Sequence, residues 1–287
     1  MRILVALDEH SYSAGIINSV ARLAANTWAD VTLLGVRPGG AAGGTFSMNH
    51  PLVNTFLGYK DDFLGQFADS YSPYTRQEQV AIGENNGIWE IPGTTDNSRK
   101  ELKIRIRSGN PDREILEEAR LTESDLIVLG CSGAGDCQWQ GLLNLPEKVA
   151  KDASCSVMVI KEERIPKKII CCMDQPSVTQ ASVEMINQIV TINEADLEII
   201  GLTGPKGLKE EVERQMDGIL RYYMAQQINA WVKLVDMGAL EEYVAQVSRD
   251  GMIALWMGKK SMLQKIFNRD LVGKLVTQAH SSVLILR

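Results

Sequence analysis

The sequence predicts an α/β protein of two tandem domains, each a doubly wound, five-stranded parallel sheet with flavodoxin-like layering of helices on both faces. Apolar runs of strand length alternate with amphipathic stretches along the whole chain, which is the pattern of parallel strands joined by helical crossovers. The same series of elements occurs twice. The length of 287 residues exceeds the roughly 100 to 200 residues of one domain, so each half can bury its own core.

The opening strand, helix and strand of the first half recur in the second half without a gap. The first apolar run leads to Asp8 in one half and to Asp174 in the other, and the second run ends at Val36 and at Leu202. Both pairs are 166 positions apart (174 − 8 and 202 − 36). This constant offset indicates that the two halves are copies of one fold.

Farther along the chain the offset falls, because the first half is longer. Gly130 aligns with Gly258, and these glycines are 128 positions apart (258 − 130). The first half therefore carries 38 additional residues (166 − 128) between its second and third strands. We place this inserted segment at about 38–97 and the two domains at 1–162 and 167–287, because a charged, proline-containing junction separates them.

Aromatic side chains recur at helical spacing within the inserted segment, at Phe56, Tyr59, Phe63 and Phe67. This spacing predicts an amphipathic helix that packs on its own domain. A lid over a ligand cleft and a partner-binding surface are the alternatives.

The composition excludes several classes of function. The net charge of −6 opposes a broad nucleic-acid surface, which needs clustered Lys and Arg. No apolar run approaches the roughly 20 residues of a transmembrane helix, and the N-terminus lacks a secretory pattern, so we expect no membrane association and a cytoplasmic location. The five cysteines are an odd number at irregular spacing, which predicts reduced thiols and not a disulfide framework.

A ligand is expected at the carboxyl ends of the strands. In a doubly wound sheet, ligands bind beyond these ends, where the strand order reverses. The first strand leads to Asp8, and the fourth enters a loop that contains Gly130 and Gly133, whose lack of side chains lets the backbone approach a ligand closely. The next helix has Asn144 as its N-cap candidate, and a helix N-terminus attracts phosphate.

Four segments of the first domain together resemble the universal stress protein family: VALDEH, IRSGNPDREILEEA, DLIVLGCSG and SCSVMVIK. The resemblance implies a fold of the adenine nucleotide alpha hydrolase type, in which nucleotide-binding members carry the pattern G-2x-G-9x-G-[ST] around the phosphates. It implies that Gly130 and Gly133 line phosphate, that Asp8 meets the adenine base and that Val36 lies on the ribose side. ATP or another adenine nucleotide is then the expected cofactor, with Asn144 at the start of the next helix.

This sequence departs from the family pattern at its last two positions. Leu143 and Asn144 stand where the family has Gly and Ser. Leu does not adopt positive φ as freely as Gly does, and Pro146 has no N–H to offer a phosphate. Two hypotheses stay open for the first domain, a weak adenine-nucleotide site and no nucleotide site.

The second domain departs further, and we expect it to be a degenerate copy. Ser261 replaces the second glycine, and Arg269 and Asp270 replace the Gly-Ser pair, although Asp174 persists. We predict a structural or regulatory role for this half.

More ordinary roles compete for the same residues. Asp8 is suited to cap the turn after its strand, and the loop glycines suit a tight strand-to-helix turn. The three histidines, His10, His50 and His280, lie far apart in the sequence and match no metal-ligand spacing. We predict no metal site and no catalytic residue.

The sequence favours a stress-response binding and signalling module over an enzyme. No P-loop pattern GxxxxGK[ST] occurs, which gives an enzyme little support. A slow ATP hydrolase is nevertheless one alternative. The main alternative is a structural tandem that docks partner proteins without nucleotide. The expected partners are an adenine nucleotide and an unidentified protein. We also expect a homodimer, in addition to a pseudo-dimer of the two halves within one chain.

Overall fold

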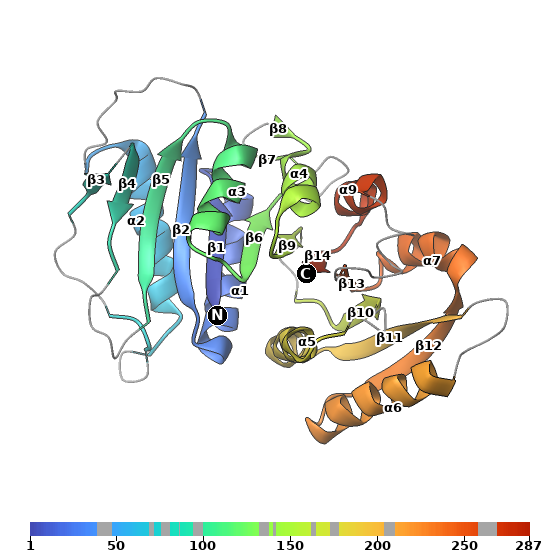
Figure 1. The fold of residues 1–287 in the computed structure, drawn as a ribbon. Coiled ribbons are helices and arrows are strands. Elements are labelled where there is room, and N and C mark those ends of the chain that lie inside the picture. Colours follow the sequence, from blue (N-terminus) through green and yellow to red (C-terminus); the bar gives the residue numbers. More distant parts are fainter. Residues whose placement is uncertain are drawn as a thin grey trace. The chain divides into compact units, whose positions relative to one another are not determined.

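The structure is a computed structural model that describes residues 1–38, 48–68, 72–75, 81–85, 87–93, 100–131, 138–139, 142–161, 165–172, 178–203, 210–257 and 269–287. Most of the described residues up to Val157 form one compact unit, and those from Met158 onward form a second (Figure 1). We call them unit 1 and unit 2. The division falls within strand β9 (Ser156–Ile160).

Unit 1 is built on a parallel sheet, as the sequence predicts. Its parallel strands follow the order β6-β1-β2-β5. They are β1 (Arg2–Leu7), β2 (Asp30–Arg37), β5 (Leu102–Ser108) and β6 (Leu126–Gly130). The strand order reverses between β1 and β6, because the chain passes from β1 outward to β2 and β5 before it returns to the other side of β1. This reversal defines the edge where a ligand is expected.

The described helices of unit 1 begin and end at residues that explain their limits. They are α1 (Ser11–Thr27), α2 (Pro51–Gly65), α3 (Pro111–Leu121) and α4 (Leu145–Asp152). At the start of α3 the Asn110 side chain accepts a hydrogen bond from the Asp112 N–H, which satisfies one of the free N–H groups of a helix start. α1 ends at Trp28, whose left-handed conformation (φ 50°) stops the helix.

Helix α2 confirms the prediction that the aromatic side chains of the inserted segment pack on their own domain. Phe56, Tyr59 and Phe63 are all buried. The Phe56 ring lies against Gly35 of β2, where an added Cβ would come within 2.9 Å of the ring. Gly35 therefore makes room for the helix.

Two antiparallel strands extend the unit 1 sheet beyond the predicted parallel strands. β4 (Ile88–Ile91) pairs with β5, and β3 (Gly83–Asn85) pairs with β4. Both belong to the inserted segment. The sequence did not reveal β3 because it is short, fully exposed and without apolar alternation. A further two-stranded sheet joins β7 (Gln138–Trp139) to β8 (Leu142–Leu143).

Unit 2 repeats the parallel sheet, and its strand order is β12-β11-β10-β13-β14. The strands are β10 (Lys168–Cys172), β11 (Asp196–Thr203), β12 (Ala230–Asp236), β13 (Met252–Trp256) and β14 (Val283–Leu286). The described helices are α5 (Gln180–Asn193), α6 (Glu210–Ala225), the short 3-10 helix η2 (Met237–Ala239), α7 (Leu240–Val247) and α9 (Arg269–Gln278). α6 stands in the same place in the order as α2, so the additional length of unit 1 lies mainly after α2, where β3 and β4 are.

The strand registers correct one detail of the predicted repeat. Ala6 of β1 pairs with Leu129, and the corresponding Cys172 of β10 pairs with Leu255. The residue that follows Leu129 is Gly130, so its counterpart in unit 2 is Trp256. The predicted alignment of Gly130 with Gly258 was therefore wrong by two residues.

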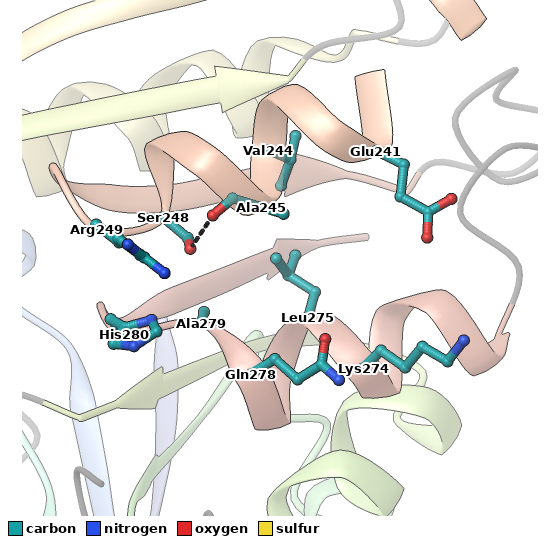
Figure 2. Close-up of a pocket in the computed structure, with 10 residues that line it drawn as sticks. All are labelled: Glu241, Val244, Ala245, Ser248, Arg249, Lys274, Leu275, Gln278, Ala279 and His280. Carbon is teal, nitrogen blue, oxygen red and sulfur yellow. Dashed lines mark hydrogen bonds between the residues drawn. The ribbon is translucent and has the colours of Figure 1, made fainter. Parts of the chain in front are cut away.

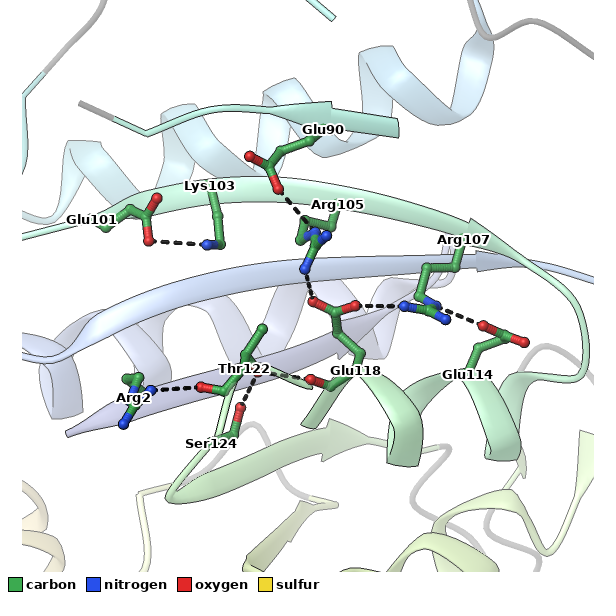
Figure 3. Close-up of polar contacts among 10 residues, drawn as sticks. All are labelled: Arg2, Glu90, Glu101, Lys103, Arg105, Arg107, Glu114, Glu118, Thr122 and Ser124. Carbon is green, nitrogen blue, oxygen red and sulfur yellow. Dashed lines mark hydrogen bonds and ion pairs between the residues drawn. The ribbon is translucent and has the colours of Figure 1, made fainter. Parts of the chain in front are cut away.

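An ion-pair network ties α3 to one face of β5 (Figure 3). The Glu118 side chain is fully buried, and its carboxylate accepts hydrogen bonds from Arg105 and, at 2.9 Å, from Arg107 Nη1. Arg107 Nε also donates to Glu114 Oε2 at 2.6 Å. Burial alone would lower the pKa of Arg107, but its bonds to Glu114 and Glu118 outweigh burial and raise that pKa. The network thus satisfies a buried carboxylate.

The cysteines only partly follow the prediction of reduced thiols. Cys155, Cys171 and Cys172 are reduced thiols. Burial raises the pKa of the Cys172 thiol to about 12, which makes it inert at neutral pH. Cys131 instead belongs to a disulfide, so the prediction was wrong for that residue. The other half of this disulfide lies outside the described residues.

Within the described ranges, no helix combines the length and the apolar character needed to cross a membrane.

Candidate functional site

The carboxyl edge of the unit 1 sheet brings together three of the predicted site residues. Asp8 follows the end of β1, Val36 lies near the end of β2 and Gly130 ends β6. β1 lies between β2 and β6, and Leu7 pairs with Gly35, so Asp8 and Val36 are at the same level of the sheet. The fold therefore places these residues at the point where the strand order reverses.

The carboxylate of Asp8 is buried in a local hydrogen-bond network. Its Oδ1 accepts from Ser13 Oγ at 2.7 Å and from the His10 N–H at 3.0 Å. Its Oδ2 accepts from the Tyr12 hydroxyl and lies 3.0 Å from His10 Nδ1. The residue is only 1% exposed. This arrangement fits the predicted capping role of Asp8, and direct contact with a base would require one of these partners to give way.

Helix α2 is tied to the same point by Tyr59. The Tyr59 hydroxyl donates a hydrogen bond to the main-chain oxygen of Asp8 at 2.8 Å. Burial, together with the negative charges of Asp8, Glu9 and Asp62, raises the pKa of Tyr59 to about 12. Sequence reasoning identified Tyr59 only as part of an apolar helix face, because nothing in the local pattern indicates that its hydroxyl reaches the end of β1.

Gly130 is a glycine because α1 passes close to it. An added Cβ would lie 3.1 Å from the main-chain oxygen of Tyr12 and 3.2 Å from Ile16 Cγ2. The start of α1 therefore packs directly on the end of β6. Tyr12 also stacks on His10, with 5.4 Å between the ring centroids, so the β1–α1 turn is itself a packed feature of this edge.

The remaining two predicted residues, Gly133 and Asn144, come after β6 in the sequence. Gly133 lies outside the described residues. Asn144 is the N-cap residue of α4, but it is left-handed (φ 67°) and its side chain caps no N–H. Asn adopts this conformation more readily than most residues, which explains how the chain enters α4 without the glycine that the family pattern has nearby.

The same edge of unit 2 differs at the position of Gly130. Trp256 stands there, with only 2% of its surface exposed. Its indole Nε1 has no hydrogen-bond partner in the described structure. A buried indole replaces the glycine that lets α1 approach β6 in unit 1, so the two edges cannot have the same shape. Asp174 and Ser261 lie outside the described residues.

A cleft of about 260 Å³ lies in unit 2 between α7 and α9, and none of the predicted site residues lines it (Figure 2). Val244 and Leu275 contribute apolar surface, and Arg249 and His280 lie together at one end. Arg249 follows α7, where its positive charge complements the helix dipole, and His280 follows α9. The charge of Arg249 is thus accounted for by the end of α7.

A known family matches the first part of the chain. The sequence profile of the universal stress protein family matches residues 1–161, which is more than half of the 287 residues. No curated protein matches the chain.

Solved structures share the fold over almost the whole chain. A universal stress protein from Archaeoglobus fulgidus DSM 4304 has a TM-score of 0.57 at 13% identity, covering 100% of this chain and 96% of that one. A functionally unknown protein from Pseudomonas aeruginosa PAO1 has a TM-score of 0.57 at 14% identity, covering 99% and 92%. The cytoplasmic domain of a prokaryotic cation chloride cotransporter has a TM-score of 0.53 at 10% identity, covering 99% and 94%. These likenesses concern the fold alone, and a shared fold does not imply a shared function.

Proposed function

Since the chain belongs to the universal stress protein family, we propose that it is a tandem stress-response module that binds ATP or another adenine nucleotide in unit 1 and signals through a protein partner. The observation that carries this proposal is the meeting of Asp8, Val36 and Gly130 at the reversal point of the unit 1 sheet. Ligands of doubly wound sheets bind at such a point. The proposed setting is the cytoplasm, although a disulfide such as that of Cys131 is uncommon there.

The proposed site places the base near the end of β1 and the phosphates near the glycine loop. Asp8 and Val36 would adjoin the base and ribose, and Gly130, Gly133 and Asn144 would adjoin the phosphates. Because the Asp8 carboxylate already has several partners within the protein, we expect modest affinity. Phosphoryl transfer needs positioned cations around the γ-phosphate, and we assign that role to no residue of the proposed site. We therefore propose that the site binds nucleotide without catalysis.

A partner-docking tandem without nucleotide is the second candidate. Two observations favour it: the Asp8 carboxylate is only 1% exposed, and Leu143 and Asn144 replace the Gly-Ser pair. In unit 2 the buried Trp256 supports a purely structural or regulatory role. A slow ATP hydrolase remains an alternative that no described contact favours.

Isothermal titration of the nucleotide-stripped, full-length protein with ATP, ADP and AMP separates these functions. The informative variant is Gly133→Val, and the matched control is Asp174→Asn, which changes only the second copy. We expect one saturable site per chain, lost in Gly133→Val and retained in Asp174→Asn. Absence of heat at about 1 mM ligand, where binding of only about 4 kcal/mol would be detected, would exclude the nucleotide function and leave the docking tandem.

A further inference from the structure

Among the described residues of unit 2, the outer edge of β12 is an unpaired sheet edge. β12 pairs with β11 on one side, and no other described strand pairs with it. The Leu197 N–H donates to the Asn229 oxygen, so the main-chain groups of Asn229, and of every second residue after it, point toward β11. The N–H and C=O groups of Val232 and Leu234 therefore point outward. None of them bonds to the described part of the chain.

The corresponding edge of unit 1 is covered within the chain. β5 holds the place in unit 1 that β12 holds in unit 2, next to the second strand of the repeat. There β4 pairs antiparallel with β5, with Trp89 opposite Ile106. Unit 2 has no counterpart of this hairpin in its described residues, so the same edge is left open. An antiparallel strand is the partner that this fold already uses at that position.

The side chains of β12 favour association over protection. Leu234 is 52% exposed, although it lies beside Gly201 of β11 and Met216 of α6. Lysine often guards an edge strand, but Lys233 Nζ lies 4.4 Å above the ring of Tyr243 on α7. Its charge is therefore held over the face of the sheet and not across the edge.

We propose that a second copy of this chain pairs with β12 through its own β12, antiparallel and centred on Leu234. In this register Leu234 faces Leu234 of the second copy, and both exchange main-chain hydrogen bonds as an antiparallel pair. Val232 faces Asp236 of the second copy, and Lys233 faces Val235. In the alternative register that is centred on Lys233, the two copies of this lysine would lie directly opposite each other, which is destabilising.

This surface gives the predicted homodimer a definite location and a two-fold symmetric form. One strand serves both copies, as isologous association requires. The interface continues the sheet from one chain into the next and buries the exposed Leu234 side chain against its own copy. The interface involves none of the proposed nucleotide-binding residues, so the dimer can be tested independently of nucleotide binding.

Disulfide trapping in the full-length protein tests the register. In the proposed pair the two Cα atoms of residue 234 are about 5.5 Å apart, within the roughly 4.4–6.8 Å that a disulfide spans. We expect Leu234→Cys to form a covalent dimer on mild oxidation. The matched control is Met224→Cys, whose parent residue is 61% exposed on α6, and it should behave like the wild-type chain with its native cysteines.

Sedimentation equilibrium tests the association itself. Leu234→Lys should weaken the dimer about tenfold or more, because two lysines would face each other, whereas Met224→Lys should leave it unchanged. Val232→Pro removes one outward N–H and spares the ladder to β11, so it should weaken the dimer while circular dichroism stays native. A wild-type chain that is monomeric throughout, or a dimer that withstands Leu234→Lys and gives no cross-link in Leu234→Cys, overturns the proposal.

Discussion

Tyr59 on α2 and Asp8 at the end of β1 are joined by a hydrogen bond of 2.8 Å from a buried hydroxyl to a main-chain oxygen. The two residues are 51 positions apart. This bond anchors the helix of the inserted segment to the edge where the predicted site residues meet, so it couples the stability of α2 to the shape of that edge.

Tyr59→Phe should destabilise unit 1. The substitution keeps the ring but leaves the Asp8 oxygen without this donor, which costs about 1–3 kcal/mol for a buried group. Urea denaturation measures the loss, and Tyr222→Phe, which breaks no side-chain hydrogen bond in the described structure, is the control. The folded-state pKa of Tyr59 is raised to about 12, so its contribution is complete below about pH 10 and is lost as the pH rises toward 12. An unchanged denaturation midpoint would contradict this role.

Gly130→Ala should also destabilise the chain, by about 1–3 kcal/mol. The new methyl group would press on the Tyr12 main-chain oxygen at 3.1 Å, which belongs to a helix start and cannot swing away as a flexible side chain would. Gly58→Ala is the matched control, because an added Cβ there meets nothing within 4 Å. In the helix interior that change should stabilise by up to about 1 kcal/mol. Thermal denaturation of both variants measures these changes. Equal shifts of the denaturation midpoint in the two variants would contradict the close packing of Gly130 against α1.

Glu118→Gln should be the most damaging of these changes. It leaves Arg105 and Arg107 without the carboxylate that both contact (Figure 3), and breaking a buried ion pair costs about 3–5 kcal/mol. Glu117→Gln on the same helix is the control, because its partner Arg120 is exposed and surface ion pairs contribute little to stability. Chemical denaturation should separate the two variants clearly. Similar midpoints would show that Glu118 is dispensable.

The repeat and most of the fold could be predicted because parallel strands buried on both faces leave long apolar runs in the sequence. Asp8 and Val36 were placed at one edge by the same logic, since the strands before them are buried and adjacent. The unit 2 counterpart of Gly130 was missed for a physical reason. The apolar run of β13 continues through Trp256 and Met257, both of which are buried. The sequence therefore does not indicate where this strand ends.

The partners of the predicted residues could not be found from local patterns. His10 and Tyr12 reach the Asp8 carboxylate through the geometry of one turn, and Tyr59 reaches Asp8 only because α2 packs beside α1. The β3–β4 hairpin depends on pairing with β5 and has little apolar periodicity of its own. The disulfide of Cys131 likewise depends on proximity in the folded chain, which cannot be inferred from the number of cysteines.

Lys161 of unit 2 should give the chain a distinctive alkaline behaviour. Its Nζ donates hydrogen bonds to the main-chain oxygens of Thr277 at 3.1 Å and Ala279 at 2.7 Å, where α9 ends. Burial lowers the pKa of Lys161 to about 8. The folded chain therefore releases this proton more readily than the unfolded chain, whose lysines have a pKa of about 10.4, so this group adds stability as the pH rises from about 8 to about 10.4.

Lys161→Gln isolates that contribution, because both proteins share every other titrating group. We expect the stability of the wild-type protein, relative to the variant, to increase across this pH interval in urea denaturation, and the Lys161 side-chain signal to titrate near pH 8 by NMR. Lys274→Gln is the control, since Lys274 is exposed and should leave the pH profile unchanged. A flat difference between the wild-type and Lys161→Gln curves would mean that the ammonium group stays hydrated at the end of α9.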